Sequence, residues 1–102
     1  MKVINANEFD KTIESGKVLV DFFADWCGPC KALAPVLEQL HDESYDAIPF
    51  VKINIDENPD VAERFGIQSI PTLIVFDEGQ VKKQLVGFLP KPMLKKTLDE
   101  VL

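Results

Sequence analysis

The sequence predicts an α/β fold in which one mixed sheet of five strands is covered by four helices on its two faces. Two observations predict it: apolar strand patterns alternate with helical patterns in the order β-α-β-α-β-α-β-β-α, and no linker or repeat interrupts them. The β-α-β units require parallel strands with right-handed crossovers, and the closing hairpin adds antiparallel strands. A length of 102 residues with 46% hydrophobic residues fits one domain, residues 1–102.

The first half of the chain supplies two strands and two helices. Residues 2–5 form a short strand, and Asn7 is expected to cap a helix that runs to Ser15. Residues 18–24 are an apolar run rich in branched and aromatic side chains, which is typical of a central parallel strand buried on both faces. Residues 27–42 form the second helix, because apolar side chains recur there at i, i+3, i+4 and i+7.

The second half supplies three strands, predicted over residues 50–55, 72–77 and 81–86. Asn58 is expected to cap a short helix that stops at Gly66. The segment Glu78-Gly79-Gln80 joins the last two strands as a hairpin. The last helix is predicted over residues 91–101.

Charge and hydropathy exclude several functions. The formal net charge is −6, whereas strong non-specific binding to nucleic acid needs a basic surface that releases counterions. Two small lysine clusters, at Lys82–Lys83 and around Lys95, are interpreted as solvated faces. No segment approaches the ~18 apolar residues of a membrane span, and the N-terminus has no signal-peptide pattern. We therefore expect a cytoplasmic protein that binds neither nucleic acid nor a membrane.

The cysteine content excludes a zinc site and a disulfide scaffold. The chain has two cysteines, Cys27 and Cys30, and one histidine, His41. These fall one short of the four ligands of a typical zinc site, so no metal is expected. A disulfide that closes so short a loop removes little chain entropy and contributes little stability, so a purely structural bridge is disfavoured.

The segment Trp26-Cys27-Gly28-Pro29-Cys30 lies between the buried strand and the long helix. The first amides of a helix lack intrahelical partners and the macrodipole is positive there, so a thiolate on Cys27 would be stabilised and reactive. Cys30 lies one turn further on, where its sulfur can face Cys27. The pattern predicts that Cys27 attacks a substrate disulfide and that Cys30 then resolves the mixed disulfide. Gly28 leaves room for the substrate, and Pro29 fixes φ in the first turn.

This run, extended to residues 20–31, closely resembles the active-site segment of the thioredoxin family. Three further motifs agree with that family in order and spacing, and they are Asn54-Ile55-Asp56-Glu57-Asn58-Pro59, Ile70-Pro71-Thr72 and Val86-Gly87. The resemblance spans essentially the whole chain. It implies the thioredoxin fold and the activity of a protein-disulfide reductase, and the Gly-Pro spacer resembles thioredoxins rather than oxidases or isomerases of the same fold.

Two charged residues are candidates for supporting roles. Asp21 interrupts the apolar strand, so it is either buried near the thiols or faces a half-exposed edge; the resemblance implies a proton shuttle for Cys30. Lys52 lies in the next strand and, by the resemblance, tunes the charge of Asp21, whereas a solvent-facing lysine is the alternative.

A mostly apolar docking surface is expected around Cys27. By the resemblance its members are Trp26, Gly28, Pro29, Ile70, Pro71, Gly87 and Phe88. Trp26 could instead be a core residue. General statistics favour a trans Ile70–Pro71 bond, and only the resemblance makes it cis, in which case the Ile70 backbone can pair with an extended substrate.

The chain departs from the family pattern at two positions. Phe23 stands where thioredoxins often have a second tryptophan, and Phe88 follows Gly87 where a small residue is common. The first departure should alter packing, and the second should reshape the docking surface.

The resemblance also implies the partners. Disulfide-containing proteins would be substrates, and a thioredoxin reductase, commonly an NADPH-dependent flavoenzyme, would restore the dithiol. The chain should bind no cofactor, because it has no phosphate-binding glycine loop, and should act as a monomer. Two alternatives stay open: a binding subunit that holds a partner through the apolar surface, and an oxidase or isomerase, which would need an oxidising compartment.

Overall fold

A computed structural model describes all residues, 1–102, and its centre is a five-stranded mixed sheet. The strands are β1 (Lys2–Ile4), β2 (Lys17–Phe23), β3 (Phe50–Asn54), β4 (Thr72–Asp77) and β5 (Gln80–Val86). Their order across the sheet is β1-β3-β2-β4-β5. β1, β3 and β2 are parallel, and β4 and β5 run antiparallel to their neighbours. The predicted fold class is confirmed.

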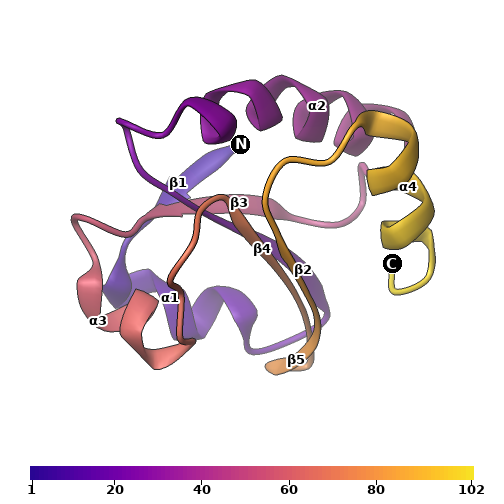
Figure 1. Cartoon of the computed structure of the whole chain (residues 1–102). Coiled ribbons are helices and arrows are strands. Elements are labelled where there is room, and N and C mark those ends of the chain that lie inside the picture. The colour runs from indigo at the N-terminus through magenta and orange to yellow at the C-terminus, as the bar shows by residue number, and fades with distance from the viewer.

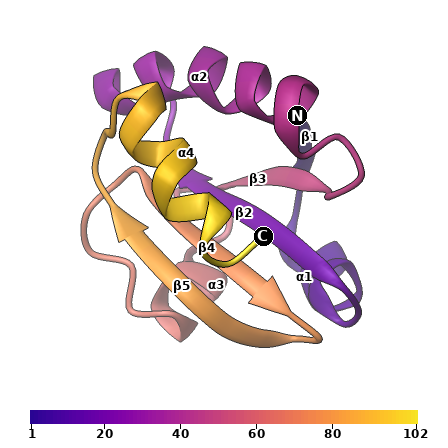
Figure 2. The ribbon, with the colours of Figure 1, turned by 90° about the vertical axis from the view of Figure 1, so that its right-hand side faces the viewer.

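Four helices cover the two faces of this sheet. They are α1 (Ala6–Ile13), α2 (Gly28–Ser44), α3 (Pro59–Arg64) and α4 (Lys91–Asp99). α2 and α4 lie on one face, and α1 and α3 lie on the other (Figure 1). Figure 2, which is turned by 90°, shows α4 in front of the sheet and next to α2. The two helices α2 and α4 are in contact. Residues 24–27 connect the end of the central strand β2 to the start of α2.

Alternation along β2 divides the core into two layers. Val18, Val20 and Phe22 belong to the cluster under α1 and α3, whereas Leu19 packs with the leucines of α2 and α4. Successive side chains of a strand point to opposite faces, so a strand covered on both faces must be apolar at nearly every position. Asp21 is the exception, and it is buried as well.

The prediction that Asn7 caps the first helix is wrong, because Asn5 occupies that position. The Asn5 side chain accepts a hydrogen bond from the Glu8 N–H at 3.0 Å, and the Glu8 carboxylate accepts one from the Asn5 N–H at 3.1 Å. This reciprocal pair is a capping box. It places Asn7 inside α1, which ends at Ile13 rather than Ser15.

Several other boundaries also differ from the predictions. α2 continues to Ser44, and α4 ends at Asp99 instead of residue 101. Asn58 is the residue before α3 as predicted, but its side chain makes no capping hydrogen bond and instead accepts from the Ala6 N–H at 2.8 Å. The hairpin turn contains only Glu78 and Gly79, both with positive φ. That geometry matches the twist of the flanking strands.

Candidate active site

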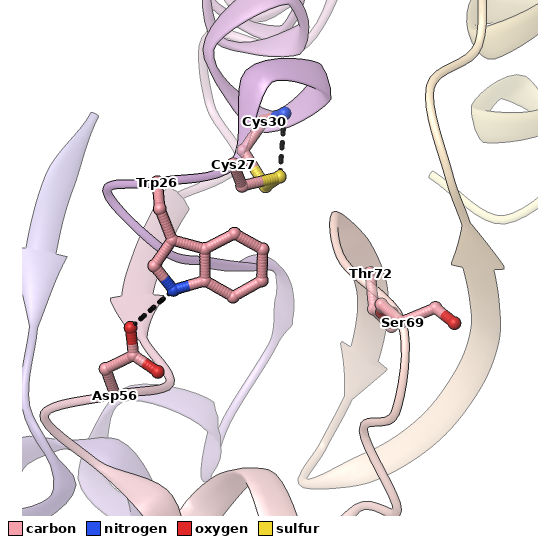
Figure 3. The surroundings of a disulfide bond; sticks show 6 residues. All are labelled: Trp26, Cys27, Cys30, Asp56, Ser69 and Thr72. Carbon is pink, nitrogen blue, oxygen red and sulfur yellow. Dashed lines mark hydrogen bonds between the residues drawn. A yellow bond between two sulfur atoms is a disulfide. The ribbon is translucent and has the colours of Figure 1, made fainter.

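Cys27 is the residue that caps the start of α2. Its backbone is extended, with φ −86° and ψ 106°, and its Sγ accepts a hydrogen bond from the Cys30 N–H at 3.1 Å (Figure 3). The two cysteines form a disulfide, with their Cα atoms 5.3 Å apart. A sulfur at this position occupies the place of a capping oxygen, so negative charge on it is stabilised by the amide and by the helix dipole. The predicted proximity of the two sulfurs is confirmed.

The disulfide lies in a small apolar cluster at the end of β2. Cys27 and Cys30 are only 3% and 4% exposed, and Ala24 is buried with them. Phe23, Ile55 and Ile70 pack against this cluster. The end of β2, the segment after β3 and the loop before β4 therefore all contribute side chains that contact the disulfide cluster.

The loop that faces the disulfide contains the cis Ile70–Pro71 peptide bond. The Thr72 hydroxyl donates to the Ser69 carbonyl at 2.5 Å across this loop. The Gly87 N–H donates to the Pro71 carbonyl at 2.8 Å, which joins the end of β5 to the same loop. Gly87 has φ +91°, a conformation that favours glycine. The cis bond expected from the family resemblance is confirmed, and Pro71 and Gly87 are brought together.

Trp26 and Phe88 are large aromatic side chains that lie exposed at the surface. Trp26 is 69% exposed and Phe88 is 45% exposed, so the alternative that Trp26 belongs to the core is wrong. Gly28 has open space where a Cβ would lie, and Pro29 lies in the first turn of α2. These placements agree with the expected docking surface, whose role stays a prediction.

Asp56 is a site residue that sequence reasoning missed. The Trp26 Nε1–H donates to its Oδ2 at 2.8 Å (Figure 3). Asn54 shapes the loop that carries Asp56, because its Oδ1 accepts from the N–H groups of Asp56 and Glu57 at 2.8 and 3.1 Å. Trp26 and Asp56 are 30 positions apart in the chain, so no local pattern in the sequence indicates their contact.

Asp21 lies beneath the cysteines on the α2 face of β2. It is 1% exposed, and its Oδ1 has no hydrogen-bond partner. Burial raises the pKa of Asp21 to about 7, and the positive charge of Lys52 lowers it by a smaller amount. The alternative of an edge-facing aspartate is therefore wrong.

A cavity of about 260 Å³ connects Asp21 with Cys30 and Lys52. Lys52 pairs with Asp21 in the parallel register of β3 with β2, and it is half-buried rather than fully exposed to solvent. Its Nζ lies 4.7 Å from the centroid of the Phe23 ring.

The chain gathers no group of three or more side chains that could hold a metal ion. No helix is both long and apolar enough to span a bilayer.

A cysteine pair at a helix N-terminus, facing a cis-proline loop at the end of a mixed sheet, defines a thiol–disulfide oxidoreductase. The family model for thioredoxin matches residues 1–100. Thioredoxins of Staphylococcus haemolyticus and Staphylococcus aureus are each 49% identical to the chain over 102 residues, which cover 100% of it and 97% of each relative. The chain belongs to the thioredoxin family. Its activity is dithiol–disulfide exchange, and its redox group is its own cysteine pair rather than a bound cofactor.

Proposed function

We propose that the chain is a general protein-disulfide reductase, with Cys27 as the nucleophile and Cys30 as the resolving thiol. The observation that carries the assignment is the hydrogen bond from the Cys30 N–H to the Cys27 Sγ, because it stabilises charge on Cys27. The Cys27 thiolate attacks one substrate sulfur, and the other substrate sulfur leaves as a thiolate and takes a proton. The Cys30 thiolate then attacks the Cys27 Sγ and releases the second substrate thiol. Two electrons pass to the substrate, and the Cys27–Cys30 disulfide remains.

Asp21 is proposed to accept the proton that Cys30 loses in the second step. A pKa of about 7 lets the carboxyl group exist in both protonation states near neutral pH, as a proton acceptor requires. The shared cavity supports a water-mediated path between the two side chains. Lys52 is proposed to favour the charged form of Asp21.

The substrate is proposed to lie against the loop at Ile70 as an added strand. Neither the N–H nor the carbonyl of Ile70 takes part in a hydrogen bond within the chain, so both are available to an extended peptide. The apolar surface around them would hold the segment beside Cys27. Its proposed members are Trp26, Gly28, Pro29, Ile70, Pro71, Gly87 and Phe88.

The family implies disulfide substrates and a reductase partner. We propose that this partner is an NADPH-dependent flavoenzyme and that the chain works as a monomer in the cytoplasm, where the dithiol form can be maintained. Nucleic acids and membranes are not proposed as partners, in keeping with the net charge of −6.

Reduction of insulin disulfides with dithiothreitol as the electron donor tests the proposal. The wild-type protein should turn over, and both Cys27→Ser and Cys30→Ser should be inactive. Cys30→Ser should trap a mixed disulfide through Cys27, which mass spectrometry of the complex would locate. A folded and reduced wild type that does not reduce insulin would refute the general reductase. Partner function that survives replacement of both cysteines by serine would then favour a binding subunit.

A further inference from the structure

The ammonium group of Lys52 is held by an aromatic ring rather than by a carboxylate. Its Nζ lies 4.7 Å from the Phe23 centroid, within the range of a cation–π contact. No ion pair within 4.0 Å involves Lys52, although Asp21 is its neighbour across the two strands. The Phe23 ring is therefore the contact that the structure shows for this ammonium group.

The same three side chains line one cavity. Its other charged or titratable members are Asp25, before α2, and Cys30 and Lys31, on α2. On the β4 side, Asp21 is paired with the apolar Leu73, which brings no charge. Burial is the main influence on the pKa of Asp21 and raises it, and the charge of Lys52 lowers that pKa by a smaller amount. A displacement of its ammonium group would thus change the electrostatic environment of the carboxyl group.

We propose that Phe23 is a positioning residue that holds the Lys52 ammonium group beside the Asp21 cavity and so favours the ionised carboxylate. Without the ring, Lys52 would extend into water, because moving an ammonium group towards a buried carboxyl carries a large desolvation cost. The inference rests on the proton-acceptor role proposed above for Asp21.

Phe23 also packs against the cluster of Ala24, Cys27 and Cys30, so a packing role must be separated from an electrostatic one. The two roles predict opposite signs. A smaller side chain that merely admits water would relieve the desolvation of Asp21 and lower its pKa. Loss of the held positive charge would raise that pKa.

The test is titration of the Asp21 carboxyl carbon by NMR in the oxidised protein, with Asp21→Asn to assign the signal. Phe23→Leu should raise the apparent pKa by roughly half a pH unit, and Lys52→Met by about one pH unit. Phe23→Trp keeps an aromatic face and should restore the wild-type value. In the Lys52→Met background, Phe23→Leu should cause no further increase.

An unchanged or lowered pKa in Phe23→Leu would overturn the proposal, as would an equal increase in the presence and absence of Lys52. The titration needs no reductase activity, so an inactive wild type would refute the proposed function and leave this result interpretable. The pH profile of insulin reduction supplies the functional readout. In Phe23→Leu, the part of this profile that depends on Asp21 should shift to higher pH by the same amount as the Asp21 pKa in the titration.

Discussion

The N–H of Cys30 points at the Sγ of Cys27 across 3.1 Å, so one cysteine of the pair caps the helix that contains the other. The capping position has a consequence for both residues. Cys27 lies at the end of the helix and its Sγ accepts a backbone N–H, whereas Cys30 is the third residue of α2 and its Sγ accepts no hydrogen bond. The chemical inequality of the two thiols thus follows from their places in one helical turn.

The first prediction concerns this inequality. In reduced Cys30→Ser, the Cys27 thiolate should form at a lower pH than in the same chain unfolded in urea, because the cap and the helix dipole stabilise it by about 1–2 kcal/mol. That energy corresponds to roughly a 5- to 30-fold larger thiolate-to-thiol ratio. Ultraviolet absorbance of the thiolate, followed as a function of pH, measures this ratio. Cys27→Ser, with Cys30 as its single thiol, is the control and should show no such stabilisation; equal titration of both variants would contradict the prediction.

The second prediction follows from the burial of Asp21. The folded protein keeps a proton on this carboxyl up to a pKa of about 7, whereas the unfolded chain loses it near 3.8. Between these values the folded state binds more protons, so this group makes the free energy of unfolding fall as the pH rises through that window. The loss is complete above the folded pKa and absent below the unfolded one. The difference between the two pKa values sets an upper limit of about 4 kcal/mol on this loss of unfolding free energy.

Replacement by asparagine removes this titration. Asp21→Asn should therefore raise the free energy of unfolding by about 2–4 kcal/mol near pH 8, and the gain should vanish near pH 4. Urea denaturation of the oxidised protein at several pH values measures the effect. Asp25→Asn is the matched control, because Asp25 borders the same cavity but is exposed. A gain that is the same at all pH values would show that the carboxyl does not titrate in this window.

The sequence predicted what short-range patterns encode. The apolar run of β2 indicated a strand covered on both faces. The position of the cysteine motif between that strand and a long helix was enough to predict that Cys27 and Cys30 meet at a helix start. The misplaced first cap shows how narrow that information is: Asn5 and Asn7 are both suitable, but only Asn5 has a glutamate three residues later.

Contacts between distant segments had no such signal. The bond from Trp26 to Asp56 depends on how the loop after β3 folds beside the loop after β2. The contact of Phe23 with Lys52 likewise depends on which side-chain rotamers the neighbouring strands allow. The cis Ile70–Pro71 bond was expected only from the family resemblance, because local physics favours the trans isomer.

The third prediction uses the fact that Trp26 is the only tryptophan in the chain. Asp56→Ala removes the acceptor of its indole N–H, so the ring should become more mobile and its fluorescence anisotropy should fall. If the ring forms part of the docking surface, KM for insulin should rise about 2- to 5-fold, which corresponds to the ~0.5–1 kcal/mol of one exposed hydrogen bond. Glu57→Ala is the control, because that exposed side chain makes no hydrogen bond. Unchanged anisotropy in Asp56→Ala would mean that the bond does not hold the ring in solution.

The fourth prediction compares two glycines near the disulfide. Gly87 has φ +91°, whereas Gly28 has an ordinary φ, and both have open space where a Cβ would lie. Steric crowding by a Cβ therefore cannot explain a difference in stability between the two alanine variants. Such a difference would come from the backbone conformation at the two positions. Gly87→Ala should lower the free energy of unfolding by about 1–2 kcal/mol, because an alanine is strained at positive φ.

Gly28→Ala should leave stability unchanged or raise it by about 0.5 kcal/mol, because alanine is favoured over glycine within a helix. Denaturant unfolding of the two oxidised variants measures both effects. The strain at residue 87 should also weaken the hydrogen bond from its N–H to the Pro71 carbonyl, which would appear as faster hydrogen exchange of that one amide. Equal stability of the two variants would mean that the end of β5 relaxes at no cost, and that Gly87 does not hold the Pro71 loop in place.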